Sequence, residues 1–213
     1  MKGAVLSGRA TFLGFYLLRL LGLSVTLSLG ASCATAQPRY DYASEPDPRK
    51  SEYVLGPSDM LKIAIWHNPD LSADATVRPD GAISLPLLGD LKAAGRTPSK
   101  LRDEIVQRLA TFIKEESVTV TVAVVGINSY RFVVTGNVEH PGSYASSRYV
   151  TVVEALVMAG GPNRFANPEQ TIIIRNDAGK GTRRIPIDFP SILNGTHPEQ
   201  DLTLLPGDTV YVP

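Results

Sequence analysis

The sequence predicts an α+β protein built from two small units, each with several short strands and one main helix. Three observations predict this class. Apolar residues alternate at every second position in several short runs, which is typical of half-buried strands. Two segments, residues 97–113 and 151–161, carry helix signals instead. Pro, Gly and Asp separate these runs and predict tight turns between them.

Residues 1–36 are predicted to be an export signal that is removed from the mature protein. Lys2 and Arg9 precede an apolar stretch, Leu20–Leu29, and small residues follow it, which is the layout of a secretory signal. This ten-residue stretch is too short to cross a bilayer of ~30 Å as a helix, since that needs about 20 residues. We therefore expect the mature chain to be exported.

Two cleavage positions remain open. Ala34–Ala36 fits an ordinary signal peptidase. Ala31–Cys33 instead resembles a lipobox, in which Cys33 would carry lipid and residues 1–32 would be the signal. Cys33 is the only cysteine, so neither alternative leaves a free thiol and no disulfide can form within one chain.

The charge balance gives no reason to expect a nucleic-acid partner. The full chain has 21 basic and 21 acidic residues, and removal of residues 1–36 would leave 18 basic residues against 21 acidic ones, a net charge of −3. A mildly acidic protein has no electrostatic attraction to a phosphate backbone. Residues 37–52 carry three prolines, many charges and no apolar periodicity, and are expected to form an extended tether.

The first unit begins with a turn and a strand. Gly56–Asp59 is the predicted turn, and the alternation of Leu61, Ile63 and Ile65 predicts a half-buried strand. Asp59 is interpreted as a turn residue that caps backbone amides, in preference to a catalytic acid.

A hairpin is predicted next. The turn Arg78–Gly81, with its Asp-Gly pair, is expected to join Val77 to a strand over Ala82–Leu85. Pro86 is expected to place that strand at a sheet edge or a bulge, because proline has no backbone N–H.

A helix follows over residues 97–113. Thr97 is the expected N-cap and Pro98 the first helical residue. From Ser117 the pattern returns to period two with β-branched residues, which predicts another strand. The buried face of the helix is expected to contain Leu101, Ile105, Leu109 and Phe112.

The second unit starts near Tyr130. A helix over residues 151–161 is expected to begin at the cap Thr151 and to stop at Gly160 and Gly161. The predicted strands and turns around it are a strand over 131–138, a turn over 139–144, a hairpin of 171–177 with 181–187, and a final turn and strand over 202–213.

One short pattern occurs in both units. Leu55–Ile63 and Leu204–Val212 share L-x-P-x-D-x-h-x-h, where h is apolar. Each copy is predicted to be a tight turn that leads into a strand. Nine positions are too few to indicate a duplication.

No pattern for covalent catalysis is present. The sequence lacks a G-x-S-x-G motif and a phosphate-binding Walker loop. Its histidines, His67, His140 and His197, lie in turn sequences near prolines and lack the spacing of a zinc site. We expect no enzyme activity, no cofactor and no metal site, while a glycosidase that brings distant carboxylates together remains an alternative.

The ordered motifs resemble a known family. Tyr53–Ile63, Val77–Pro86 and Leu88-Gly89 are similar to the polysaccharide export domain of outer-membrane capsule and exopolysaccharide exporters. Val133–Tyr144, residues 151–162 and 204–213 resemble the soluble-ligand-binding β-grasp (SLBB) domain of that family. The resemblance implies a small mixed-sheet export domain with one main helix over 53–128, followed by a β-grasp domain over 129–213.

The resemblance also implies which residues carry the family motifs. None of them has a catalytic, cofactor or metal role, and all are expected to set the shape of turns. They are Gly56, Pro57, Asp59, Arg78, Pro79, Asp80, Gly81, Pro86, Gly136, Pro141, Gly142, Gly160, Gly161, Pro206, Gly207 and Asp208.

Family membership implies a function in export. Members form homo-oligomeric rings, often octamers, in the periplasm and at the outer membrane, and work with an inner-membrane polysaccharide co-polymerase. The protein would conduct exopolysaccharide or capsular polysaccharide without covalent chemistry. Larger members add a second β-grasp domain and a C-terminal amphipathic helix, which this sequence lacks after Pro213, so we expect it to need another component at the outer membrane. The alternative is a periplasmic glycan-binding β-grasp module without a transport role.

Overall fold

The computed structural model describes residues 40–113, 118–177, 179 and 181–213. The predicted export signal, Cys33 and both cleavage positions lie outside these residues. Within the part of the chain that is described, no helix is both long and apolar enough to cross a membrane. Helices and sheets are mixed, which confirms the α+β class.

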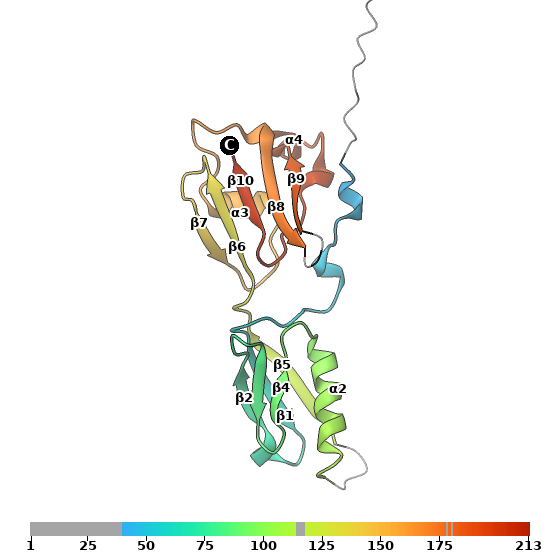
Figure 1. Ribbon diagram of the computed structural model, residues 1–213. Helices are drawn as coiled ribbons and strands as arrows, with labels where there is room; N and C mark the ends of the chain where they lie inside the picture. The colour runs from blue at the N-terminus through green and yellow to red at the C-terminus, as the bar shows by residue number, and fades with distance from the viewer. Residues whose placement is uncertain (1–39, 114–117, 178, 180) are drawn as a thin grey trace, which may run out of the picture. The chain divides into compact units, whose positions relative to one another are not determined.

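The first domain contains a three-stranded sheet, a separate hairpin and one helix (Figure 1). The sheet has the order β2-β1-β5, and both neighbours run antiparallel to β1. The hairpin consists of β3 and β4. The elements are β1 (Met60–Ile65), the 3-10 turn η3 (Pro69–Leu71), β2 (Ala73–Thr76), β3 (Ala82–Leu85), β4 (Gly89–Lys92), α2 (Pro98–Leu109) and β5 (Val120–Gly126).

The predicted strand and helix share one apolar core. Leu61, Ile63 and Ile65 of β1 are buried, and the residues between them are exposed, as the alternation predicts. The helix α2 also begins as predicted, because the Thr97 side chain accepts a hydrogen bond from the Lys100 backbone at 3.3 Å and proline occupies the first position.

The buried face of α2 contains Leu101, Ile105 and Leu109. Phe112 was predicted on the same face, and this prediction is wrong, since its side chain is 58% exposed. The physical reason is that α2 ends at Leu109. Phe112 then lies in a turn in which its backbone N–H bonds to the Leu109 carbonyl at 2.9 Å, so the helical spacing no longer applies.

A hairpin was predicted around the turn Arg78–Gly81, but the structure forms its hairpin around the next turn along the chain. Arg78–Gly81 forms a tight turn, closed by a 2.8 Å bond from the Gly81 N–H to the Arg78 carbonyl, but the strands on its two sides do not pair with each other. β2 pairs with β1, whereas β3 pairs with β4 across the connection that Pro86 starts. Pro86 follows the last residue of β3, where its missing N–H costs no ladder bond. Leu87 and Gly89 complete the reversal with φ of 64° and 66°.

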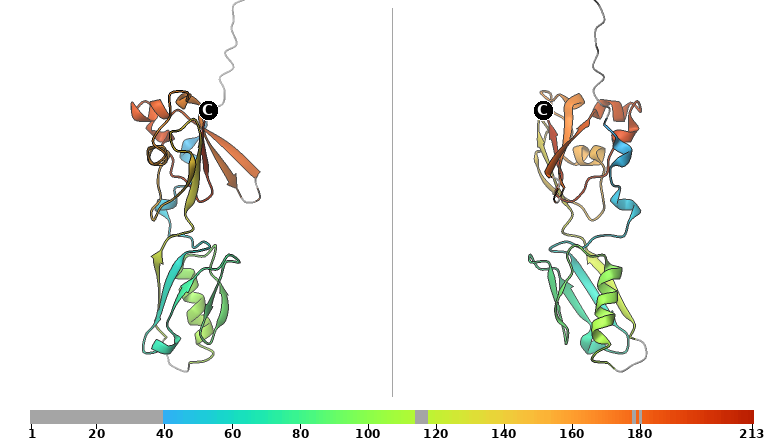
Figure 2. Two further views of the ribbon diagram at one scale, coloured as in Figure 1. Left: turned by 90° about the vertical axis from the view of Figure 1, so that its left-hand side faces the viewer. Right: turned by 45° about the vertical axis from the view of Figure 1, so that its right-hand side comes forward.

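The second domain contains a five-stranded mixed sheet with helices packed on one face (Figures 1 and 2). The order is β7-β6-β10-β8-β9, and only the β6–β10 pair is parallel among the described strands. The predicted strands and the hairpin of β8 with β9 are confirmed. The elements are β6 (Arg131–Gly136), β7 (Gly142–Ala145), α3 (Val152–Met158), η4 (Pro168–Gln170), β8 (Thr171–Asp177), β9 (Gly181–Ile187), α4 (Phe189–Leu193), η5 (Pro198–Gln200) and β10 (Thr209–Val212).

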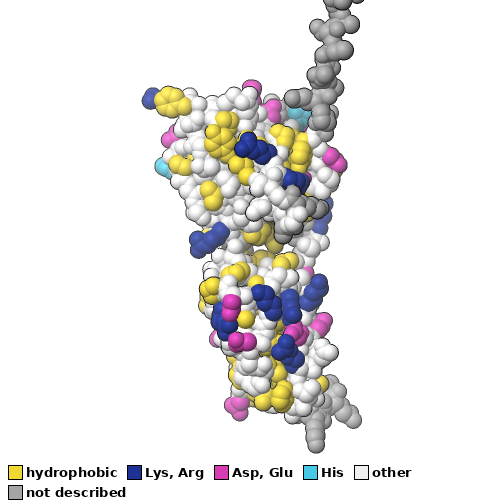
Figure 3. All heavy atoms as spheres, viewed as in Figure 1, with side chains coloured by type: hydrophobic (Ala, Val, Ile, Leu, Met, Phe, Trp, Pro, Cys, Tyr) yellow, Lys and Arg dark blue, Asp and Glu magenta, His cyan; other side chains and the backbone are white. Residues whose placement is uncertain are grey.

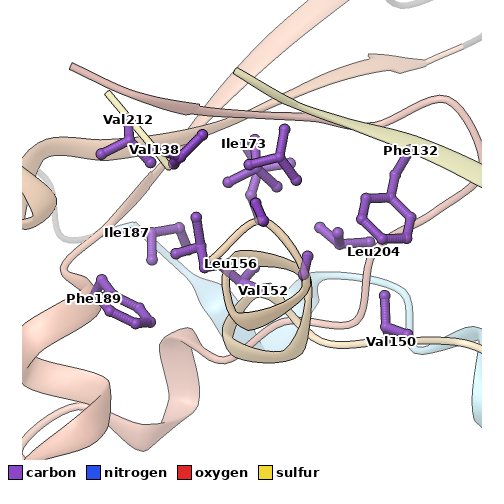
Figure 4. Close-up of a cluster of buried hydrophobic side chains, with 14 of the residues drawn as sticks. Phe132, Val138, Val150, Val152, Leu156, Ile173, Ile187, Phe189, Leu204 and Val212 are labelled. Carbon is purple, nitrogen blue, oxygen red and sulfur yellow. The ribbon is translucent and has the colours of Figure 1, made fainter. Parts of the chain in front are cut away.

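Helix α3 packs beneath this sheet and has the predicted ends. The Thr151 side chain bonds the Glu154 N–H, and the Glu154 carboxylate bonds the Thr151 N–H, which is a capping box. Gly160 and Gly161 follow the helix with φ of 82° and 84°. Figure 4 shows the apolar layer between the strands and α3, to which Phe132, Val152, Leu156, Ile173, Leu204 and Val212 contribute.

The segment Tyr40–Glu52, here called the strap, contacts the second domain. Tyr40 and Tyr42 pack against the apolar core of that domain, and the Tyr42 hydroxyl donates to the Pro186 carbonyl at 2.7 Å. An extended tether was predicted for residues 37–52. From Tyr40 onward the segment is instead folded onto the domain, because its tyrosines find apolar partners there. Its 3-10 turns are η1 (Tyr42–Ser44) and η2 (Pro48–Lys50).

Candidate functional site

The carboxylate of Asp59 is a hydrogen-bond centre at the start of β1. It is fully buried and its Oδ1 accepts from the backbone N–H groups of Asn128 and Ser129 at 2.9 and 2.8 Å. Its Oδ2 accepts from the Gly56 N–H at 2.9 Å, the Tyr53 hydroxyl at 2.7 Å and the Ser129 hydroxyl at 3.0 Å. Asp59 therefore caps backbone amides and joins its own turn to residues 128–129.

These bonds determine the charge state of Asp59. Burial by itself would raise the pKa of the carboxyl, but the hydrogen bonds from Gly56, Tyr53, Ser129 and Asn128 outweigh it and lower the pKa below its ordinary value of 3.8. A carboxyl that holds its proton less tightly and has all its lone pairs engaged is poorly suited to act as a general acid. Its geometry suits a structural role.

The second copy of the shared pattern folds in the same way. The Leu205 N–H donates to Asp208 at 2.7 Å, as the Gly56 N–H does to Asp59. In both copies the aspartate N–H also donates to the carbonyl three residues earlier. Asp208 differs in its second partner, because Arg175 donates to it through Nε at 3.0 Å and Nη2 at 2.6 Å.

Arg175 extends this pair to the strap. Its Nη1 donates to Glu45 at 2.8 Å, and Nη1 of Arg183 donates to the other oxygen of Glu45 at 2.6 Å. The side chains of Glu45, Arg175 and Asp208 are each 2% exposed. The Tyr40 hydroxyl also donates to Glu45. This network, here called the strap lock, consists of Glu45, Arg175, Arg183 and Asp208.

The strap lock keeps Glu45 ionised. Burial alone would raise the pKa of Glu45, but the hydrogen bonds from Arg183 and Tyr40 and the charges of both arginines lower it below its ordinary value of 4.5. Burial and the bond to Glu45 raise the pKa of Tyr40 to about 12. Sequence reasoning did not single out Glu45, because a lone acid in a proline-rich segment carries no local signal.

The family-motif residues of the first domain shape an exposed turn. Arg78 bonds Asp90 through Nη1 at 3.0 Å and also bonds Asp80. The hydrogen bond from Arg78 and then that from the Ala82 N–H lower the pKa of Asp80 to about 2. Pro79 lies in the same exposed turn.

Two glycines of the first domain are constrained by neighbours. Gly81 has a φ of 81°, and a side chain there would meet the Ala94 methyl group at 2.8 Å. A side chain at Gly56 would overlap Ser129, and Pro57 follows in an exposed turn.

The motif residues of the second domain lie at the end of β6 and beside the end of α3. Gly136 has a φ of 92°, and a side chain there would overlap the Val212 carbonyl oxygen. The His140 N–H donates to the Ala159 carbonyl at 2.9 Å, which brings the turn that includes Pro141 and Gly142 beside Gly160 and Gly161.

Pro206 and Gly207 lie in the exposed turn before Asp208. None of these motif contacts assembles a nucleophile with a base, and the described residues contain no cluster of three potential metal ligands.

A pocket of about 400 Å³ lies between the strap and the loop before α3. Arg49, Ser51 and Tyr53 line one side of it, and Ser147–Tyr149 line the other. Sequence reasoning missed this pocket, because its two sides are about one hundred positions apart in the chain. Its aromatic rings, hydroxyls and two arginine side chains suit the binding of a small molecule.

Charges of both signs are mixed on the face of the first domain that Figure 3 shows. Arg78, for example, is paired with both Asp80 and Asp90.

Two family descriptions match the chain in order. Residues 47–123 match the family described as polysaccharide biosynthesis/export protein. Residues 131–188 match the SLBB domain. The two matches correspond to the first and second domains of the structure.

Three relatives illustrate the similarity. The exopolysaccharide production protein ExoF of Rhizobium meliloti is 34% identical over 136 residues, which are 57% of this chain and 31% of the relative. The EPS I polysaccharide export outer membrane protein EpsA of Ralstonia solanacearum is 28% identical over 188 residues, or 77% of this chain and 48% of the relative. The capsule polysaccharide export outer membrane protein CtrA of Neisseria meningitidis is 25% identical over 208 residues, or 88% and 51%. The chain spans about a third to a half of the length of these relatives.

Proposed function

Since the chain belongs to the polysaccharide biosynthesis/export family and has an SLBB domain after its export domain, we propose that it conducts exopolysaccharide or capsular polysaccharide out of the cell without covalent catalysis. The observation that carries this proposal is the presence of both domains in one chain, in the order in which they match. The relatives with this similarity are named for polysaccharide export or production. The buried charged residues bond backbone groups, in the case of Asp59, or each other, in the case of Arg175 and Asp208, which agrees with a non-catalytic role.

The proposal includes location and anchoring. The mature protein would occupy the periplasm and the outer membrane, as expected for an exported relative of outer-membrane proteins. Cys33 would attach it to the membrane through lipid, or cleavage after Ala36 would release it without an anchor. Its export domain would cover residues 53–128 and its β-grasp domain residues 129–213. The family-motif residues would set turn geometry in both domains.

The proposal also includes partners. We infer a homo-oligomeric ring, with eight copies as one candidate size, that receives polymer from an inner-membrane co-polymerase. The second face of the five-stranded sheet supports an association, because Val133, Ile172 and Ile174 remain only partly buried there and Tyr211 is exposed. A closed ring would place different faces of neighbouring copies in contact. Intact mass and electron microscopy of the purified mature protein would test ring formation and lipid attachment together.

Gene deletion tests the transport role. We expect the deletion strain to lose surface polysaccharide while sugar-nucleotide synthesis continues, and plasmid-borne wild-type protein to restore it. A plasmid with a stop codon in place of Tyr53 controls for the vector. Normal amounts of surface polysaccharide in the deletion strain would contradict the proposal.

A glycan-binding module without a transport role is the second candidate. The pocket beside Tyr149 is the observation that favours it. A monomeric mature protein with saturable oligosaccharide binding, in a strain whose export is unaffected by the deletion, would favour this alternative over the conduit.

A further inference from the structure

The pocket beside Tyr149 has the size and the lining of a small-molecule site. Its volume of about 400 Å³ lies within the range of about 300–1,000 Å³ that is common for ligand pockets. The strap forms one side through Pro48, Arg49 and Ser51, with Tyr53 directly after it, and Ser147–Tyr149 form the other side. The pocket is therefore complete only while the strap is docked.

Three tyrosines give the pocket an aromatic side with one free hydroxyl. The ring of Tyr149 lies edge-on to Tyr130 at 5.1 Å and tilted to Tyr53 at 6.3 Å. The Tyr130 hydroxyl bonds the Leu204 carbonyl and the Val150 N–H, and the Tyr53 hydroxyl bonds Asp59. The Tyr149 hydroxyl bonds no group among the described residues, so it is available to a ligand.

The charged groups of the pocket are already neutralised. Arg148 donates to Glu154 through Nη1 at 2.9 Å, and Arg49 donates to Asp47 through Nε at 2.9 Å. Two cations and two carboxylates leave no net charge. Because each guanidinium has five N–H groups, both arginines keep donors that bond nothing within the described part of the chain. This arrangement favours a neutral ligand with many hydroxyl groups over a phosphate or a free carboxylate.

We propose that this pocket binds one neutral sugar unit, with its ring against Tyr149 and its hydroxyls on Arg49 and Arg148, and that the docked strap completes the site. A sugar ring offers both an apolar C–H face, which suits an aromatic side chain, and hydroxyls, which suit the free donors. The choice of a sugar rests on the proposed function in glycan export. The strap lock then controls the site, because a ligand that binds only the docked form also stabilises docking.

A substitution that fills the pocket tests the site without removing contacts. Ser147 is exposed, and its side chain makes no hydrogen bond among the described residues. We expect S147W to occupy the pocket and S143W, on the exposed side of β7, to serve as its matched control. A second pair is E45Q, which weakens the strap lock, with E169Q, an exposed acid in η4, as its control.

Binding is measured on the purified mature protein by ligand-observed NMR with two probes. The neutral probe is cellotriose and the acidic probe is trigalacturonic acid. We expect wild type, S143W and E169Q to bind cellotriose more tightly than the acidic probe. S147W should weaken cellotriose binding at least about tenfold and E45Q by several-fold, while far-UV circular dichroism stays unchanged.

Three results would overturn the inference: no binding of cellotriose to wild type, equal binding by S147W, or tighter binding of the acidic probe. The gene-deletion assay is independent of this measurement. If cellotriose fails to bind while the deletion strain still loses surface polysaccharide, the sugar site is wrong and the transport role stands. If cellotriose binds and the deletion strain exports normally, the transport role fails and the site remains.

Discussion

Glu45 is the residue whose substitution should loosen the strap most. It receives charged hydrogen bonds from Arg175 at 2.8 Å and Arg183 at 2.6 Å in a site where its side chain is 2% exposed. In E45Q the amide oxygen can still accept one of these bonds, but the amide N–H₂ would face an arginine. The substitution therefore exchanges an attractive contact for an unpaired donor.

The magnitude follows from the partners that remain. Breaking a buried ion pair costs about 3–5 kcal/mol when the other charge is left without a partner. Arg175 keeps Asp208 at 2.6 Å, and Arg183 is 38% exposed and can be hydrated. We therefore expect E45Q to destabilise strap docking by an amount at the lower end of this range, about 3 kcal/mol. Because the strap lies before the first strand of either domain, the loss should appear first as local opening without unfolding of the β-grasp core.

Amide hydrogen exchange measures this opening directly. The Glu45, Lys50 and Ser51 amides make backbone hydrogen bonds within the strap. A loss of about 3 kcal/mol corresponds to exchange about 100-fold faster, since each 1.4 kcal/mol is a factor of ten. E169Q is the control and should leave these amides unchanged. Exchange in E45Q within about threefold of wild type would refute the role assigned to the strap lock.

Three further predictions concern other parts of the structure and its pH dependence. D59N should lower the free energy of unfolding by about 2–4 kcal/mol, because one buried oxygen that accepts N–H groups becomes a donor. Urea denaturation measures this change. The control is D80N, at an exposed residue, which should have a far smaller effect. G136A should be much more destabilising than G161A, since both glycines have positive φ but only a side chain at Gly136 overlaps the Val212 carbonyl; similar urea midpoints for the two variants would contradict the clash. The lowered pKa values of Glu45 and Asp59 mean that the unfolded state binds more protons. Stability should therefore be complete above the ordinary glutamate pKa of 4.5 and decline as the pH falls through the lower folded values; a urea midpoint that stays constant from neutral pH to about pH 3 would contradict this.

Local patterns were sufficient for most elements. The Thr97-Pro98 start of α2 and the Thr151 cap of α3 depend on short-range interactions, so the sequence alone reveals them. The alternation in β1 likewise reports a single buried face. The prediction that Phe112 is buried was wrong because helical spacing does not show where the helix ends.

Long-range contacts could not be predicted in this way. Glu45 and Arg175 are 130 positions apart, and neither has a neighbour in sequence that indicates its partner. The partner of β3 was also misassigned, because an Asp-Gly turn identifies a chain reversal but does not decide which strands pair. The pocket forms only where the strap meets residues about one hundred positions away, so no local sequence pattern could predict it.

The two copies of the shared pattern now suggest why it occurs twice. Each aspartate caps its own turn. Each also bonds, directly or through one arginine, a second segment that is distant in sequence. Asp59 bonds the amides of Asn128 and Ser129, which lead into the second domain. Asp208 holds Arg175, and Arg175 holds Glu45 of the strap. An aspartate at this position can therefore fasten a connection because the turn leaves carboxylate lone pairs to spare. Substitutions at Asp59 or Asp208 should accordingly loosen a connecting segment before they alter either apolar core.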